Sequence, residues 1–169
     1  MYRILFVCTG NICRTPIAAA ILQHFIRKEK LETIIDVESA GTWAMDGNPV
    51  SENTRRVCQE HGLDVAHHRA RHIDHFMVKE ADLILCMAEQ HKLDLLTIYP
   101  HFRNKIFTLK EFMATENHRT LSVDDPYGRN IMAYRKTFRE IEQEIQRIWP
   151  ELKARAQQKV RCMERASDQ

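Results

Sequence analysis

The segment that most constrains the fold lies at the start of the chain. Residues 2–8 (YRILFVC) form an apolar run with polar flanks, which is typical of a strand buried on both faces. Such strands belong to parallel sheets covered by helices, so this run favours an α/β fold. The rest of the chain agrees, because strand-like apolar runs alternate with segments whose apolar residues recur at helical spacing.

This alternation predicts the order of the elements. Further strands are expected at 34–40, 81–87 and 105–109, and helices at 16–29, 50–61, 89–99 and 131–149. Thr15 is a candidate cap for the first helix, with Pro16 at its first position, and Gly62 is the expected stop of the second helix. The predicted architecture is a three-layer α/β fold, in which a twisted four-stranded parallel sheet has helices on both faces.

Size, charge and cysteine content narrow the class of protein. At 169 residues the chain fits one domain, expected at 1–150, with a helical or frayed tail at 151–169. Residues 1–150 hold 20 basic and 20 acidic residues and the tail five and three, which gives no electrostatic case for nucleic-acid binding. No apolar run approaches the ~20 residues of a membrane span. Five cysteines without a C-x-x-C pair argue against a disulfide framework or a zinc site, so we expect a cytoplasmic protein without a metal.

The turn between the first strand and the first helix (residues 8–15, CTGNICRT) has the features of an anion site. Unpaired backbone N–H groups at such a turn bind phosphate, and Gly10 is expected to supply backbone angles that other residues resist. Next to a helix dipole and an arginine, the pKa of Cys8 should be lowered, so that a thiolate forms. Arg14 can bind two phosphate oxygens at once. The loop therefore suits nucleophilic attack by Cys8 on phosphorus, and it lacks the G-x-x-x-x-G-K-[ST] pattern of nucleotide-binding loops.

A proton donor for the leaving group is expected in the second half of the chain. Residues 113–130 lack periodicity, and loops of this length in compact domains are often functional. Within them, Asp125 precedes Pro126, which restricts the backbone before it and so fixes the direction of the carboxyl group. The adjacent Asp124 and a desolvated cleft would raise one carboxyl pKa, as an acid catalyst requires. Taken by itself, the segment also fits an ordinary turn.

Five segments resemble a known family. They are residues 7–14 (VCTGNICR), 39–42 (SAGT), 70–71 (AR), 81–87 (ADLILCM) and 125–127 (DPY). In this order, over roughly residues 2–149, they resemble the low-molecular-weight protein tyrosine phosphatase family, whose bacterial branch includes protein-arginine phosphatases. The resemblance implies hydrolysis of phosphotyrosine in protein substrates, and a cognate tyrosine kinase is a candidate partner. A monomer or weak dimer is expected.

The resemblance also implies residue roles. Cys8 would form a phosphocysteine, Arg14 would bind phosphate, and Asp125 would act first as an acid and then as a base for water. Ile12, Trp43 and Tyr127 would form the walls of the substrate pocket, although a packed or exposed loop tryptophan remains an alternative for Trp43. Residues expected to bind phosphate or support the loop are Thr9, Gly10, Asn11, Ile12, Cys13, Thr15 and Ser39.

Several alternatives stay open. Arginine phosphatases of the bacterial branch carry threonine where this chain has Ile12, and an apolar contact to a ring favours phosphotyrosine over phosphoarginine. Arsenate reductases use a similar loop with a relay of further cysteines, but Cys58, Cys86 and Cys162 are expected on separate elements. A phosphate-binding module without catalysis is a third alternative, disfavoured by the joint presence of Cys8 and Asp125.

Cys13 has two interpretations. As a small apolar loop residue it would only pack. As a redox partner it would trap oxidised Cys8 in a reversible disulfide, which five residues of separation allow.

Overall fold

The first strand occupies the middle of a four-stranded sheet, which places its end at the centre of the molecule. The computed structural model describes residues 1–115 and 120–168. The strands are β1 (Tyr2–Cys8), β2 (Ile35–Gly41), β3 (Leu83–Cys86) and β4 (Ile106–Thr108), in the order β2-β1-β3-β4. All three pairings are parallel, which confirms the predicted sheet.

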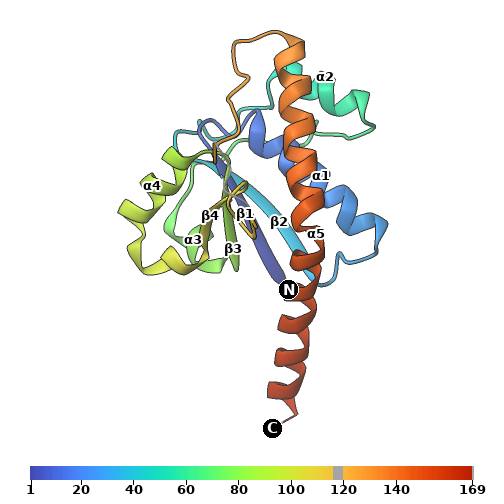
Figure 1. Cartoon of the computed structure of the whole chain (residues 1–169), viewed down its shortest axis with the longest axis vertical. Helices are drawn as coiled ribbons and strands as arrows, with labels where there is room; N and C mark the ends of the chain where they lie inside the picture. Colours follow the sequence, from blue (N-terminus) through green and yellow to red (C-terminus); the bar gives the residue numbers. More distant parts are fainter. Residues whose placement is uncertain (116–119, 169) are drawn as a thin grey trace.

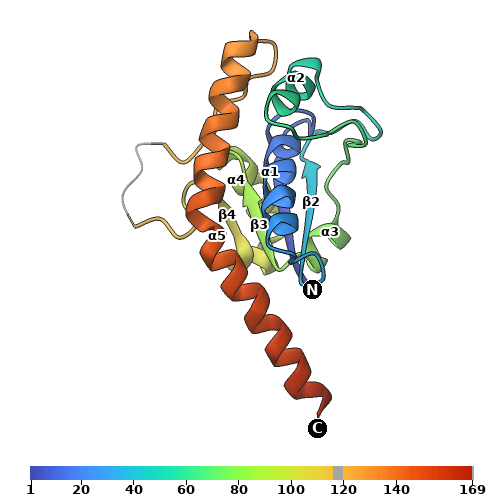
Figure 2. The ribbon, with the colours of Figure 1, turned by 90° about the vertical axis from the view of Figure 1, so that its right-hand side faces the viewer.

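Helices cover both faces of this sheet, as predicted (Figures 1 and 2). They are α1 (Arg14–Lys28), α2 (Glu52–Glu60), α3 (His75–Glu80), α4 (Glu89–Ile98) and α5 (Ile131–Ser167), with a short 3₁₀ helix η1 (Pro100–Lys105). Successive side chains of a strand point to opposite faces. Accordingly, Ile4 and Phe6 of β1 join the core beneath α1 and α5, whereas Leu5 and Val7 join the core beneath α3 and α4. Burial on both faces explains the apolar run of β1.

One local prediction differs from the structure, one helix was not predicted, and one prediction falls partly outside the described residues. Helix α1 begins at Arg14, so Pro16 is its third residue, and Thr15 does not cap it. Helix α3 was not expected, because six residues are too few for a periodic pattern; its start is capped by Asp74, whose Oδ1 accepts from the Met77 N–H at 2.8 Å. The expected loop at 113–130 includes residues 116–119, which lie outside the described residues.

The last helix continues past the expected end of the domain. Helix α5 runs unbroken through Pro150, although a proline inside a helix costs about 3 kcal/mol. Contacts on both sides of Pro150 offset that cost: the Trp149 Nε1–H donates to Glu29 Oε1 at 2.9 Å, and Leu152 and Ala156 lie fully buried in the core. Further along, Lys159 Nζ pairs with Asp82 Oδ2 at 2.7 Å.

We therefore propose that the core of the domain includes the helical turns up to Ala156, and that only the turns beyond Lys159 form an extension. Those turns project past the end of the sheet that carries the N-terminus (Figures 1 and 2). Within the described part of the chain, no helix is long and apolar enough to cross a membrane.

This division leads to a stability prediction. Leu152→Ala is expected to lower the free energy of unfolding by about 2–5 kcal/mol, because it leaves a cavity in the core. Met163→Ala, on the exposed extension, should change it by less than about 0.5 kcal/mol. Urea denaturation of both variants measures the difference, and equal effects would place the domain boundary elsewhere.

Candidate active site

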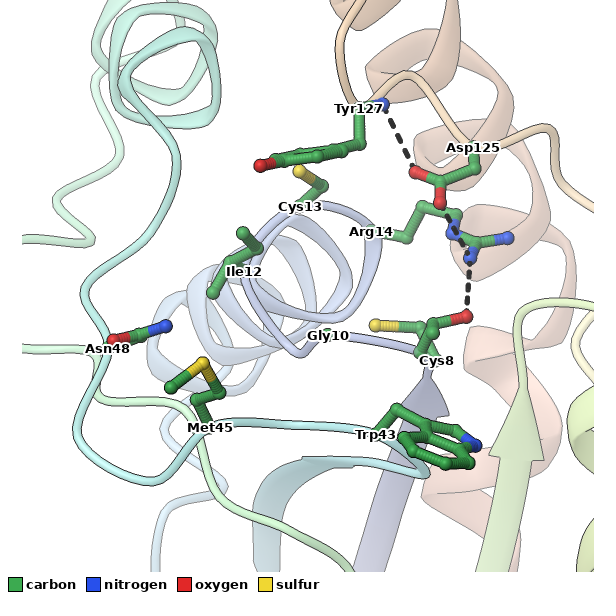
Figure 3. A pocket seen from close by; sticks show the side chains of 11 residues that line it. Cys8, Gly10, Ile12, Cys13, Arg14, Trp43, Met45, Asn48, Asp125 and Tyr127 are labelled. Carbon is green, nitrogen blue, oxygen red and sulfur yellow. Dashed lines mark hydrogen bonds and ion pairs between the residues drawn. The ribbon is translucent and has the colours of Figure 1, made fainter.

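A pocket of about 250 Å³ opens where β1 ends and α1 begins (Figure 3). Its lining comprises Cys8, Thr9, Gly10, Ile12, Cys13, Arg14, Trp43, Met45, Asn48, Asp125 and Tyr127. The structure thus brings the three expected catalytic residues into one pocket, although Asp125 is more than a hundred positions from Cys8. Asn11, Thr15 and Ser39 lie behind the pocket and support it.

The loop obtains its shape from Asn11 rather than from Gly10. Asn11 has a left-handed backbone (φ 56°), which asparagine tolerates better than most residues, whereas the expected special angles at Gly10 are not found. A Cβ atom at Gly10 would meet only Ile12 Cγ1, at an ordinary 3.6 Å. Glycine is required instead at Gly41, where a Cβ atom would lie 2.3 Å from the Thr9 carbonyl oxygen. The end of β2 can therefore approach the loop closely.

The side chain of Asn11 organises the groups behind Cys8. Its Nδ2 donates to Thr15 Oγ1 at 2.8 Å and to Ser39 Oγ at 2.9 Å, and its Oδ1 accepts from the Arg71 N–H at 2.9 Å. Because the Thr15 oxygen already accepts from Asn11, its own proton is free to point at the Cys8 sulfur, 3.0 Å away. Thr15 thus serves the thiol and not the start of the helix.

The pKa of Cys8 reflects two opposed influences. Complete burial of the sulfur raises the pKa of the thiol above its ordinary value. The Thr15 hydroxyl, the charge of Arg14 and the backbone N–H groups of Thr15 and Asn11 all lower it, but they do not outweigh the burial. The expectation of a net lowered pKa is therefore wrong for this structure. The sequence reveals the groups that stabilise the thiolate, whereas desolvation follows only from packing.

A variant of Thr15 can measure how much its hydroxyl lowers the pKa of Cys8. Thr15→Val keeps the shape of the side chain but removes the hydroxyl, and should raise the pKa of Cys8 further, since a hydrogen bond to a charged group contributes about 1.5–3 kcal/mol. The pH dependence of Cys8 alkylation by iodoacetamide reports this shift. Thr15→Ser, which keeps the hydroxyl, is the control and should alkylate as the wild type does; an unchanged midpoint in the valine variant would contradict the assigned role.

Arg14 is held in place from several sides. Its side chain is almost fully buried, with Nη1 donating to the Val123 carbonyl oxygen at 2.9 Å and Nη2 lying 3.4 Å from both Thr9 Oγ1 and Asp125 Oδ2. The other Asp125 oxygen accepts from the Tyr127 N–H at 3.1 Å, so the carboxylate is aimed by its own turn (Figure 3). A fixed guanidinium at the loop can bind a phosphoryl group. The carboxylate beside it can exchange a proton with the group that leaves or attacks.

The walls of the pocket combine apolar side chains with the polar side chains of Thr9, Asn48 and Asp125. Ile12, Met45 and Tyr127 line it together with Trp43, whose side chain is 80% exposed. The backbone N–H of Trp43 donates to the Thr9 carbonyl oxygen at 3.0 Å, which places the tryptophan beside the loop. Met45 and Asn48 were not anticipated, because they follow β2 in a segment without a recognisable pattern.

Two histidines also support the loop. His68 Nε2 lies 2.6 Å from the Asn11 carbonyl oxygen, and His91 Nε2 lies 2.9 Å from Thr9 Oγ1. Both are distant in sequence from the loop, and no spacing signal identifies them. In the described part of the chain, no group of three or more His, Cys, Asp or Glu side chains is arranged to bind a metal ion.

The remaining cysteines do not form a relay with Cys8. Cys58 and Cys86 are fully buried in α2 and β3, and burial raises the pKa of Cys58 to about 12. Cys162 is exposed on the extension of α5. The sulfur of Cys13 contacts the hydroxyls of Ser51 and Tyr134, at 3.3 and 3.5 Å. A disulfide between Cys13 and Cys8 stays a prediction, which mass spectrometry after mild peroxide treatment would test.

Together, the parallel sheet and the phosphate-binding loop that joins β1 to α1 define a small α/β phosphatase. Comparison with known families agrees: the model of the low molecular weight phosphotyrosine protein phosphatases matches residues 3–159, and the chain belongs to this family. Members of the family act on phosphorylated proteins.

Relatives with two different substrates are similar to the chain. It is 36% identical over 147 residues to a protein-arginine-phosphatase of Geobacillus stearothermophilus (87% of this chain, 93% of the relative). It is 32% identical over 151 residues to EpsP of Ralstonia solanacearum, a probable low molecular weight protein-tyrosine-phosphatase (89% and 96%).

Solved structures show the same division. The YwlE arginine phosphatase from G. stearothermophilus superposes with a TM-score of 0.82 at 34% identity, covering 94% of this chain and 97% of that one. A low molecular weight protein tyrosine phosphatase from T. tengcongensis gives 0.81 at 38% identity, covering 89% and 99%. Overall similarity therefore does not choose between the two substrates.

Proposed function

We propose that the chain hydrolyses phosphotyrosine in proteins through a phosphocysteine intermediate at Cys8. The Cys8 thiol first releases its proton to solvent, and the Asp125 carboxylate takes one up. The Cys8 thiolate then attacks phosphorus, and the bond from phosphorus to the tyrosine oxygen breaks while Asp125 gives that oxygen its proton. Water then attacks the phosphocysteine and loses a proton to Asp125, so the sulfur–phosphorus bond breaks and phosphate and the thiolate are released. No cofactor is needed, because water is the only reactant in the two steps besides the phosphorylated protein.

The arrangement of Cys8, Arg14 and Asp125 supports this mechanism. The sulfur sits at the end of β1 with the N–H groups of the loop around it, and Arg14 is anchored by Val123 so that its fork faces the same space. These groups hold the negative charge that spreads over the phosphoryl oxygens during transfer. Asp125 lies against the outer side of the guanidinium, where a leaving group would depart.

The apolar and aromatic side chains on the pocket wall favour tyrosine over arginine as the leaving group, and this is the observation that carries the choice. A phenyl ring can contact Ile12, Met45 and Tyr127 without losing hydrogen bonds. A phosphoarginine would bring several N–H donors into the pocket, where Asp125 supplies the only carboxylate among the lining residues that the structure describes. Unpaired donors there would cost about 1–3 kcal/mol each.

Matched peptides that carry phosphotyrosine or phosphoarginine at the same position test the choice. The wild-type chain should show at least a tenfold higher kcat/KM on the phosphotyrosine peptide. Ile12→Thr should move this ratio towards phosphoarginine by adding a hydroxyl. Ile12→Val, in which valine has the shape of threonine but no hydroxyl, should not. A clear wild-type preference for phosphoarginine would overturn the substrate assignment and leave the phosphatase assignment standing.

The wider setting follows from the same proposal. We propose a cytoplasmic enzyme that acts as a monomer or weak dimer on the products of a cognate tyrosine kinase, without a metal ion. The burial of Cys58 and Cys86 away from the pocket gives the arsenate-reductase alternative no support. The inactive-module alternative requires that Cys8 and Asp125 serve binding alone, which a turnover assay decides.

A further inference from the structure

His91 lies in the first turn of α4, outside the lining of the pocket, yet it contacts the phosphate-binding loop. It is almost fully buried, with 4% of its surface exposed. Its Nδ1 accepts from the Ala88 N–H at 3.1 Å, and its Nε2 lies 2.9 Å from Thr9 Oγ1. The mechanism proposed above assigns no role to this buried ring.

The contact with Ala88 settles which ring nitrogen carries the proton. An N–H group can only donate, so Nδ1 of His91 must be unprotonated, and in a neutral ring the proton is then on Nε2. Burial and the charge of Arg14 favour the neutral ring, since they lower the pKa of His91 to about 4, against the opposing charges of Asp94 and Asp125. His91 therefore donates to the Thr9 hydroxyl.

Thr9 consequently receives two hydrogen bonds on one oxygen. His91 Nε2 donates at 2.9 Å, and Arg14 Nη2, which can only donate, lies 3.4 Å away. A hydroxyl oxygen has two acceptor positions, so both are used, and the hydroxyl proton must point in the remaining direction. Thr9 lines the pocket together with Cys8 and Arg14, so this proton is available to a group bound there.

We propose that His91 is a positioning residue, which orients the Thr9 hydroxyl so that its proton is donated to an oxygen of the phosphoryl group during transfer. The inference rests on the phosphatase function proposed above and adds a donor to it. Without His91, the hydroxyl can rotate and point its proton at other acceptors, so that the donor must be reoriented in every turnover. A donor that is fixed in advance avoids this cost in the transition state.

A purely structural role for His91 must be distinguished from this one. The Ala88 contact stabilises the start of α4, as a side chain three residues into a helix often does. The Thr9 contact is made by the other nitrogen of the ring, so the two roles can be separated by substitution. His91→Asn keeps an acceptor at the position of Nδ1 but does not reach Thr9, whereas His91→Gln keeps a donor that can reach the position of Nε2.

Steady-state hydrolysis of p-nitrophenyl phosphate compares these two variants. We expect His91→Asn to lower kcat about tenfold, with KM changed less than about twofold, because the lost interaction acts in the transition state. His91→Gln should stay within about threefold of the wild type. Thermal unfolding of both variants reports the structural role of His91. The variant with the lower kcat should not also be the one with the lower Tm.

A double-mutant cycle with Thr9→Val completes the test. If His91 acts through the Thr9 hydroxyl, His91→Asn should cause little further loss in the Thr9→Val background, because the group that it orients is already absent. Fully additive losses, or equal losses in the asparagine and glutamine variants, would overturn the proposal. A wild-type chain that does not hydrolyse the aryl phosphate would instead overturn the proposed function, so the two failures are distinguishable.

Discussion

Cys8→Ser is expected to reduce kcat on p-nitrophenyl phosphate by about 10⁴-fold or more. A serine hydroxyl at this site would have to lose its proton in a buried position, and neither Arg14 nor the loop N–H groups can accept that proton. Cys162→Ser, which changes an exposed thiol on the extension of α5, is the control and should leave kcat unchanged.

Phosphate binding by the Cys8→Ser variant shows whether only the nucleophile has been lost or the whole phosphate site. The serine variant should still bind inorganic phosphate, measured by calorimetry, because Arg14 and the backbone of the loop remain in place. Wild-type turnover by the serine variant would contradict the entire mechanism. Loss of turnover together with loss of phosphate binding would show that the loop had misfolded, and Cys8→Ala would then be needed to examine the nucleophile.

Asp125→Asn is expected to lower kcat by about 10²–10⁴-fold, the range for loss of a general acid. The loss should depend on the leaving group, since p-nitrophenolate departs readily without a proton and unsubstituted phenolate does not. Phenyl phosphate should therefore be affected more strongly than p-nitrophenyl phosphate. Measuring kcat for a series of aryl phosphates gives this dependence directly.

The neighbouring carboxylate provides the matched control for this prediction. Asp124 is exposed and does not line the pocket, so Asp124→Asn should stay within about threefold of the wild type on every substrate. Similar losses in both variants, or a loss in Asp125→Asn that is the same for all leaving groups, would mean that the carboxylates act only through their charge.

The sequence by itself determined the class of fold and the main chemical groups. The apolar run at 2–8, the cysteine at its end and the arginine six positions later are local features, and adjacent residues remain adjacent however the chain packs. The segment around Asp125 could be recognised for the same reason, because Asp-Pro constrains its own backbone. The continuation of α5 was harder to read, since Pro150 is a local signal against a helix, and the buried contacts that offset it come from distant elements.

The tertiary structure alone decided the backbone angles, the hydrogen-bond partners and the pKa values of those groups. Asn11, not Gly10, carries the unusual backbone angle, and the hydroxyl of Thr15 faces the Cys8 sulfur because Asn11 occupies its oxygen. His91 reaches Thr9 across 82 positions of sequence, and no spacing pattern encodes such a contact. Hydrogen-bond direction and desolvation depend on where distant atoms meet, so the raised pKa of the Cys8 thiol is a property of the packed molecule and not of the motif.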